Sequence, residues 1–208
     1  VPVGAVEQHG PHLPVSTDMT IAEGMAAEIA SRVQSGSVLV MPGVSFGKSD
    51  EHLDFAGTVT LDEATLLATL TAIGQGVRRA GLGRVVFLNA HGGNVPVIQI
   101  ACRKLRIECD LFAVAAGWFT MGLPEGMITP DAARDDIHGG FIETSVMLHM
   151  RPDLVDMEQA QNFAPASGQV AQENEILRML GPVSAGWVAQ DLHPLGAAGD
   201  ARRASAGA

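Results

Sequence analysis

Short apolar runs alternate with amphipathic segments along the first 115 residues, and this alternation limits the folds open to the chain. Four runs have the length and apolar character of strands: residues 1–6, 37–41, 84–89 and 111–115. The segments between them space their apolar side chains as helices do. Because helices that cross between strands require those strands to be parallel, we predict an α/β fold with a mainly parallel sheet and helices on both faces.

Local signals place the ends of several helices. A helix is expected to begin at Thr17 or Asp18. The pattern Thr60-x-x-Glu63 has the form of a capping box before another helix, which Gly81 would end. Further helices are expected near residues 97–105, 143–150 and 173–180. A chain of 208 residues with 47% hydrophobic content suits one core, so we expect a single domain across residues 1–208.

Charge and composition argue against some function classes. The formal net charge is −10, basic residues form no stripe and Tyr is absent, so nucleic acid is not an expected partner. The chain has neither an apolar run of about 18 residues nor a signal-peptide pattern, so no membrane partner is expected. Cys102 and Cys109 lie in an apolar stretch of the sequence, so we expect both to act as small buried hydrophobic residues. These features predict a cytoplasmic protein.

Polar side chains follow two of the predicted strands directly. Glu7 and His9 come after the first run, and His91 comes after the strand that ends at Asn89. Asp18 returns to the same strand ends at the start of the next helix. Ligands in open α/β sheets bind at the carboxyl ends of the strands. Carboxylates and imidazoles without cysteine suit Zn, Mn or Fe(II), and an aspartate can bridge two ions, so the cluster predicts a metal site.

Each of these signals has a simpler reading when taken alone. A single histidine is more often a hydrogen-bonded polar residue than a ligand, and Asp18 suits a helix start. The residues His91-Gly92-Gly93-Asn94 could form a tight turn that uses positive φ angles, or could cradle an anion at the following helix. The alternative function is therefore a non-catalytic module that binds a nucleotide or phosphate with this turn.

Taken together, the motifs resemble the creatininase (creatinine amidohydrolase) family along almost the whole chain. They occur in the family's order and spacing: Glu7-Gln8-His9-Gly10-Pro11-His12-Leu13-Pro14, Glu51-His52, Phe55-Ala56-Gly57-Thr58, Asn89-Ala90-His91-Gly92-Gly93-Asn94, His138-Gly139-Gly140 and Glu143-Thr144-Ser145. The resemblance implies a three-layer αβα fold, hydrolysis of a C–N amide bond by a metal-activated water, and a homo-oligomer that is often hexameric. The expected substrate is a small-molecule amide or a short peptide, such as a creatinine-like ring, a formamide or a peptide C-terminus.

The resemblance also implies a binuclear centre with two divalent ions per subunit. Glu7 and His91 would hold one ion, His9 would hold the other, and Asp18 would bridge them. Creatininase itself has an acidic ligand two residues after the histidine that matches His91, whereas this chain has Gly93. Glu143 is therefore either the missing ligand and a catalytic residue or an acidic residue in the first turn of a helix.

The remaining catalytic and substrate-binding residues are also expectations. His138 is the candidate for proton transfer, because an imidazole near neutral pKa can protonate a leaving amine; the alternative is a structural histidine. Ser49 and His52 lie in a Gly-bounded loop that either closes over substrate or is merely exposed. Trp118 matches one of the two tryptophans with which creatininase holds its substrate, without a clear second.

The resemblance bears on chain length as well. The family continues past the motif that matches Gly199-Asp200 into a final helix, and the first strand of this chain is already under way at Val1. We therefore expect a domain that is truncated at both ends.

Overall fold

The computed structural model describes residues 1–34 and 36–207. Two compact units divide the chain. Unit 1 consists of Val1–Glu7, Asp18–Asp50 and Val59–Gly122, and unit 2 consists of Gln8–Thr17, Glu51–Thr58 and Leu123–Ala208. The expectation of a single domain stays a prediction.

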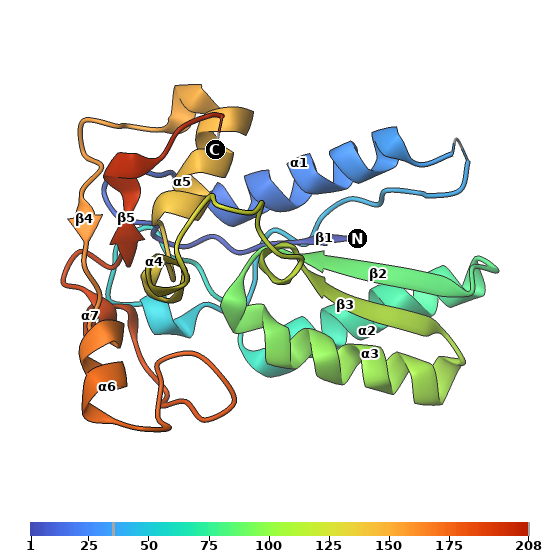
Figure 1. The fold of residues 1–208 in the computed structure, drawn as a ribbon. Coiled ribbons are helices and arrows are strands. Elements are labelled where there is room, and N and C mark those ends of the chain that lie inside the picture. Colours follow the sequence, from blue (N-terminus) through green and yellow to red (C-terminus); the bar gives the residue numbers. More distant parts are fainter. Residues whose placement is uncertain (35, 208) are drawn as a thin grey trace. The chain divides into compact units, whose positions relative to one another are not determined.

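A three-stranded parallel sheet forms the centre of unit 1 (Figure 1). Its strands are β1 (Pro2–Val3), β2 (Arg84–Asn89) and β3 (Phe112–Gly117), in that spatial order. Helix α1 (Thr17–Arg32) lies on one side of the sheet, and α2 (Glu63–Arg79) and α3 (Val95–Cys109) lie on the other. The predicted α/β fold with a parallel sheet is confirmed, and β2 spans the predicted residues.

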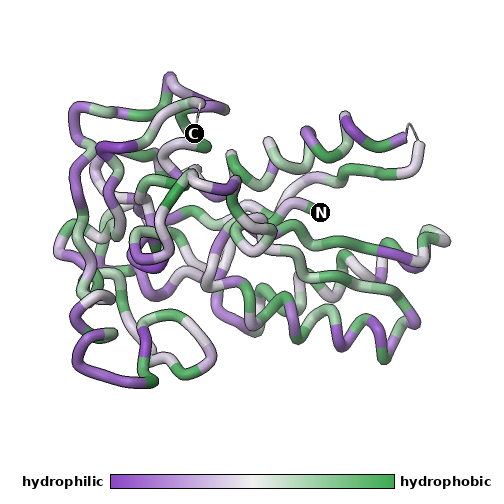
Figure 2. The backbone as a smooth tube through the Cα atoms, in the orientation of Figure 1, coloured by the Kyte–Doolittle hydropathy of each residue, from purple (hydrophilic) through white to green (hydrophobic). Residues whose placement is uncertain are grey.

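The core of unit 1 lies between the sheet and helices α2 and α3. Val85 and Phe87, alternate residues of β2, are buried in it. Helix α3 adds five buried residues along one face, and Figure 2 shows hydrophobic and hydrophilic residues alternating along this helix. A Cβ on Gly74 would lie 2.3 Å from Leu105 Cδ1, so glycine at this position of α2 permits the close approach of α3.

The strand predicted at residues 37–41 is wrong. The segment makes no strand pairing, and Val38, Leu39 and Val40 are 49%, 70% and 42% exposed. The parallel pairing with β1 is made by Val44, whose N–H donates to the Pro2 carbonyl at 3.0 Å. Apolar content alone does not distinguish a buried strand from an exposed extended segment.

Asp62, rather than Thr60, caps helix α2. The Asp62 carboxylate accepts a hydrogen bond from the N–H of Thr65 at 2.6 Å. The Thr60 hydroxyl accepts from the N–H of Ser49 at 2.8 Å and so holds the neighbouring loop. The predicted cap is therefore wrong by two residues, whereas Gly81 follows the end of the helix with φ of 85°, as expected.

Unit 2 is built from shorter elements. Its helices are α4 (Pro130–Asp135), α5 (Phe141–Met150), α6 (Ser167–Glu173) and α7 (Ala189–Leu192), and its antiparallel strands are β4 (Asn162–Phe163) and β5 (Gly199–Asp200). The chain also forms 3-10 turns at Asp50–His52, Gly92–Asn94, Trp118–Thr120, Pro152–Leu154 and Ala201–Arg203. Across the described parts of both units, no helix has the length and apolar character needed to cross a membrane.

The two helices predicted in this part of the chain had different outcomes. The helix expected at residues 143–150 is confirmed as α5, which begins two residues earlier. The helix expected near residues 173–180 is wrong, because α6 ends at Glu173. The guanidinium of Arg178 donates to the carbonyls of Asn174, Glu175 and Leu177, so a side chain satisfies carbonyl groups that helical N–H groups would otherwise bond.

Candidate metal centre

The turn after β2 is locked by two asparagine side chains. The Asn89 amide donates to the carbonyl of His91 at 2.6 Å and accepts from the His91 N–H at 3.2 Å. The Asn94 amide donates to the carbonyl of Gly4, beyond the end of β1, at 2.9 Å and accepts from the N–H of Lys48. These bonds hold the strand ends together and fix the position from which His91 projects. Gly92 and Gly93 lie in a 3-10 turn between β2 and α3, so the reading of this motif as a tight strand-to-helix turn is confirmed. Neither glycine has a positive φ angle, so that part of the reading is wrong.

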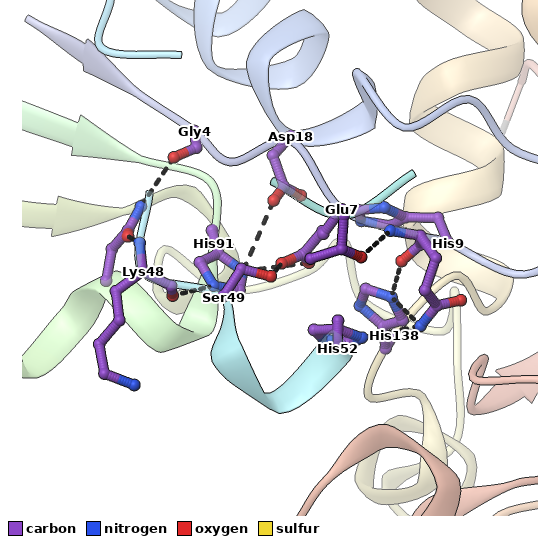
Figure 3. A network of polar contacts seen from close by, with 12 residues as sticks. Gly4, Glu7, His9, Asp18, Lys48, Ser49, His52, His91 and His138 are labelled. Carbon is purple, nitrogen blue, oxygen red and sulfur yellow. Dashed lines mark hydrogen bonds and ion pairs between the residues drawn. The ribbon is translucent and has the colours of Figure 1, made fainter. Parts of the chain in front are cut away.

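His91 faces two buried carboxylates of unit 1 (Figure 3). Its Nδ1 lies 3.1 Å from Glu7 Oε1 and 3.5 Å from Asp18 Oδ2. Its Nε2 lies 2.7 Å from the Lys48 carbonyl, and a carbonyl only accepts, so Nε2 carries the proton of the neutral ring. Nδ1 and two carboxylate oxygens thus converge as acceptors, and histidine ligands of metals commonly bond a carbonyl in this way. These side chains fit a divalent cation.

Ser49 is also part of this cluster. Its hydroxyl donates a short hydrogen bond to Glu7 Oε2, while its backbone N–H is held by Thr60. The carboxylate of Glu7 is therefore held at Oε2, and its Oε1 is directed toward His91. The structure places Ser49 against a candidate ligand, and its contact with substrate stays a prediction.

Three imidazole rings form a tilted stack in unit 2, with His138 in the middle (Figure 3). Its ring centroid lies 4.1 Å from that of His9 and 4.2 Å from that of His52. All three histidines are buried. Two contacts hold His138 in place. Its Nε2 lies 2.6 Å from the Gln8 carbonyl, and its backbone pairs with that of Ala198.

Glu143 lies beside this stack in the first turn of α5. Its Oε2 accepts from the N–H of Gly139 at 2.6 Å and lies 3.9 Å from His9 Nε2. One ligand atom from each of His9, His138 and Glu143 could reach a common ion, since these atoms lie within 4.8 Å of one another. Both roles foreseen for Glu143, ligand and helix-start residue, are compatible with this position.

The variant Glu143→Gln separates those two roles. If Glu143 is a ligand, its neutral amide analogue should weaken one metal site by at least about 10-fold, because an amide oxygen is a much poorer donor. If Glu143 only favours the helix start, the loss is about 0.3 to 1 kcal/mol of stability with unchanged metal affinity. Metal titration of the stripped variant, with thermal unfolding, decides between them. Glu63→Gln in the first turn of α2 is the matched control.

Asp136 caps helix α5. Its carboxylate accepts from the N–H of Ile142 at 3.2 Å. Burial raises the pKa of the Asp136 carboxyl from 3.8 to about 7; the N–H groups of Ile142 and Phe141 oppose this rise and the charge of Asp200 adds to it. Near neutral pH the folded carboxyl is therefore part protonated, although it sits at a helix N-terminus.

The raised pKa predicts how stability depends on pH. The folded state keeps the proton of Asp136 where the unfolded chain has lost it, so the free energy of unfolding should fall as pH rises from about 4 to about 7. Asp136→Asn keeps an acceptor oxygen but cannot ionise. It should be more stable than wild type by roughly 4 kcal/mol at about pH 8, with the difference vanishing near pH 4. Denaturant unfolding measures this.

The control for Asp136→Asn is Asp153→Asn. Asp153 is an exposed carboxylate of the same unit, paired with Arg151. Its substitution should change stability little at either pH. Identical pH profiles for wild type and Asp136→Asn would contradict the assignment of a raised pKa to Asp136.

His12 anchors its loop to the rest of unit 2. Its Nε2 lies 2.9 Å from the Thr144 hydroxyl, and its ring stacks on Phe163 at 5.3 Å. Burial, with a smaller contribution from His9, lowers the pKa of His12 from 6.5 to about 4. His12 is therefore neutral at neutral pH, and its contacts with Thr144 and Phe163 fix the loop.

The two predicted substrate-binding residues outside the Ser49 cluster lie in different units. Trp118 begins the 3-10 turn after β3 in unit 1 and packs edge-on against Phe119. His52 lies in unit 2, where Trp187 meets its ring edge-on at 6.5 Å. The sequence had offered no second tryptophan beside Trp118. Trp187 stands in a segment without periodicity, so no local pattern linked it to His52.

Comparison with known proteins places these residues in a family. The family model named Creatininase and described as creatinine amidohydrolase matches residues 1–208. The mycofactocin precursor peptide peptidase of Mycobacterium ulcerans is 35% identical, over 99% of this chain and 76% of its own length. The creatinine amidohydrolase of Pseudomonas putida is also 35% identical, over 80% of this chain and 69% of its own length.

Solved structures agree with these matches. A Bacteroides fragilis protein, named only provisionally as a creatinine amidohydrolase, has a TM-score of 0.83 and 29% identity, covering 99% of this chain and 79% of its own. A manganese form of creatininase has a TM-score of 0.74 and 31% identity, covering 99% of this chain and 81% of its own. A variant creatininase of Zn–Zn type matches equally well. On the match to all 208 residues and on these structural similarities, the chain belongs to the creatininase family.

Proposed function

We propose that this chain hydrolyses a C–N amide bond of a small molecule or short peptide with two divalent metal ions bound per chain. The observation that best supports the proposal is the convergence of Glu7, Asp18 and His91, whose buried acceptor atoms suit a cation. Membership of the creatininase family makes the chain a hydrolase that acts on C–N bonds.

The proposed ligands come from both histidine–carboxylate clusters. Glu7 and His91 would hold one ion, His9 would hold the other, and Asp18 would be shared between them. Glu7 and His9 are separated by Gln8 alone, so one short segment supplies a ligand to each ion. Zn, Mn and Fe(II) all accept this donor set. When bound, the ions polarise the substrate carbonyl and lower the pKa of water toward neutrality.

His138 is proposed to move the proton that hydrolysis must transfer. Attack of water on the carbonyl forms a C–O bond and breaks the C–N bond, and the departing nitrogen must gain a proton. A buried imidazole can take that proton from the water and give it to the nitrogen. The His138 ring lies between those of His9 and His52, and its Nε2 bonds the Gln8 carbonyl, so the ring is held in position.

The substrate class is proposed from the relatives. A peptide peptidase and a creatinine amidohydrolase are each 35% identical to this chain, so identity does not choose between a peptide and a small cyclic amide. Ser49, His52 and Trp118 remain the proposed substrate contacts, and the position of Trp187 beside His52 supports adding it to them. The proposal also includes the assembly and the location of the protein. We propose a homo-oligomer, for instance a hexamer, in the cytoplasm. The free thiols of Cys102 and Cys109 fit such a reducing compartment.

No observation favours the alternative of a phosphate-binding module. The asparagine side chains of the turn at residues 89–94 are bonded to backbone groups of unit 1, which is a structural use of the motif. Chelation distinguishes the two functions. A phosphate-binding module would keep its ligand after the metal is removed, whereas the hydrolase would lose turnover.

The proposal is tested by assaying the metal-reconstituted chain against creatinine, formamides and peptides, with release of the C-terminal residues followed for the last. Turnover of one class that disappears on chelation and returns with added metal is the expected result. Metal-independent turnover, or binding of nucleotides without turnover of any amide, would contradict it.

A further inference from the structure

Backbone groups fix both ends of the Gln8 side-chain amide. Its Oε1 lies 2.8 Å from the N–H of Gly10, and its Nε2 lies 2.8 Å from the carbonyl of Gly196. A backbone N–H only donates and a carbonyl only accepts, so these two partners determine which end of the amide is oxygen and which is nitrogen. The orientation of the Gln8 amide is therefore not open to a flip.

The second N–H of this amide is directed at His52. Gln8 Nε2 lies 2.7 Å from His52 Nδ1. Because Nε2 of Gln8 is the donating end, Nδ1 of His52 must accept. The proton of the neutral His52 ring consequently lies on Nε2, which makes that atom a hydrogen-bond donor.

The backbone of Gln8 fixes the proton of His138 in the same way. His138 Nε2 lies 2.6 Å from the Gln8 carbonyl and must donate to it. The 3.4 Å contact between the amide nitrogen of Gln8 and His138 Nε2 then joins two donors and is not a hydrogen bond, since both amide hydrogens are already directed at Gly196 and His52. In neutral His138 the basic atom is therefore Nδ1.

The surrounding chain is shaped to hold Gln8 in this position. Gln8 is 6% exposed. Gly196 has φ of 75°, and a Cβ there would lie 2.6 Å from both the oxygen and the nitrogen of the Gln8 amide. Two residues later, Ala198 bonds the backbone of His138 in both directions, with N···O distances of 2.6 and 3.1 Å. The segment from Gly196 to Ala198 thus holds Gln8 and His138 together.

We propose that Gln8 is a positioning residue that sets the proton positions of two active-site histidines. It places the proton of His52 on Nε2 through its side chain and that of His138 on Nε2 through its carbonyl. The catalytic role of these proton positions rests on the proposed function. Nδ1 of His138 accepts the proton that the attacking water loses and returns it to the leaving nitrogen, so His138 ends the cycle neutral. His52 can only donate from Nε2.

Nitrogen NMR of the ¹⁵N-histidine-labelled full chain tests this directly, with zinc as the diamagnetic metal. Long-range ¹H–¹⁵N spectra distinguish the protonated from the unprotonated ring nitrogen. The expected result is a proton on Nε2 and none on Nδ1 for both His52 and His138. A wild-type spectrum with the proton of either ring on Nδ1 would overturn the proposal, whether or not the chain hydrolyses amides.

The variant Gln8→Glu reverses the hydrogen bond to His52. A carboxylate can only accept, so the proton of His52 should move to Nδ1, while Gly10 keeps its acceptor. Gln169→Glu, at an exposed residue of α6 in the same unit, adds the same charge and should leave both rings unchanged. An unmoved His52 proton in folded Gln8→Glu would contradict the proposal. The readout needs no substrate, so failure of the hydrolase assignment would not mask the result.

Discussion

His138→Ala should lower turnover by about 10²- to 10⁴-fold while leaving the metal content of the chain intact. The expected loss is large because the variant lacks the group that carries the proton from water to the leaving nitrogen. His138 makes no ligand bond in the proposed centre, so the metal should stay. Steady-state kinetics and elemental analysis of the same preparation measure both quantities.

His149→Ala is the matched control for this prediction. His149 lies in the last turn of α5 and is exposed, so its loss should change neither turnover nor metal content. If His138→Ala released an ion, His138 would be a ligand together with His9 and Glu143, a set that the geometry also permits. Unchanged turnover would remove His138 from the reaction altogether.

Asp18→Ala should reduce bound metal from about two ions to one or fewer per chain. A carboxylate shared by two ions is the one ligand whose loss weakens both. Oδ2 of Asp18 lies 3.5 Å from His91 Nδ1, and the Asp18 side chain is buried. Turnover should fall by roughly 10³-fold, since several kcal/mol of transition-state charge stabilisation depend on the ions.

Asp18 also stands in the first turn of α1, so its loss has a structural component that must be measured separately. Asp62→Ala removes a true helix cap in the same unit and should cost about 0.5 to 2 kcal/mol of stability without releasing metal. Two ions retained in folded Asp18→Ala would exclude Asp18 from the bridging position.

The sequence predicted the fold and part of the site where the signals come from residues that are neighbours in the chain. The apolar run of β2 placed His91 at a strand end, and parallel pairing of β1 with β2 brought the segment before Glu7 to the same edge. The family motifs then identified the charged residues of the site, because only a few residue types can act as metal ligands. The fold class and the Glu7, Asp18 and His91 cluster followed from these local signals.

Sequence reasoning failed where distant contacts decide the structure. The apolar residues 38–40 are exposed, and a residue outside the predicted strand, Val44, makes the pairing. Thr60 could cap a helix by its spacing, but its hydroxyl bonds the N–H of Ser49, eleven residues away. Gln8 gave no signal of its own, since its role depends on Gly196, 188 residues later. Such partners are set by packing that no local pattern records.

Metal titration of the stripped full chain tests the central claim most directly. Binding should saturate at two divalent ions per chain, and amide turnover should rise with occupancy and vanish again on chelation. The convergence of acceptor atoms from Glu7, Asp18 and His91 supports one of these ions. His9, with Asp18 shared, would hold the second. A folded chain that binds less than one ion, or that turns over its amide substrate fully without metal, would contradict the account.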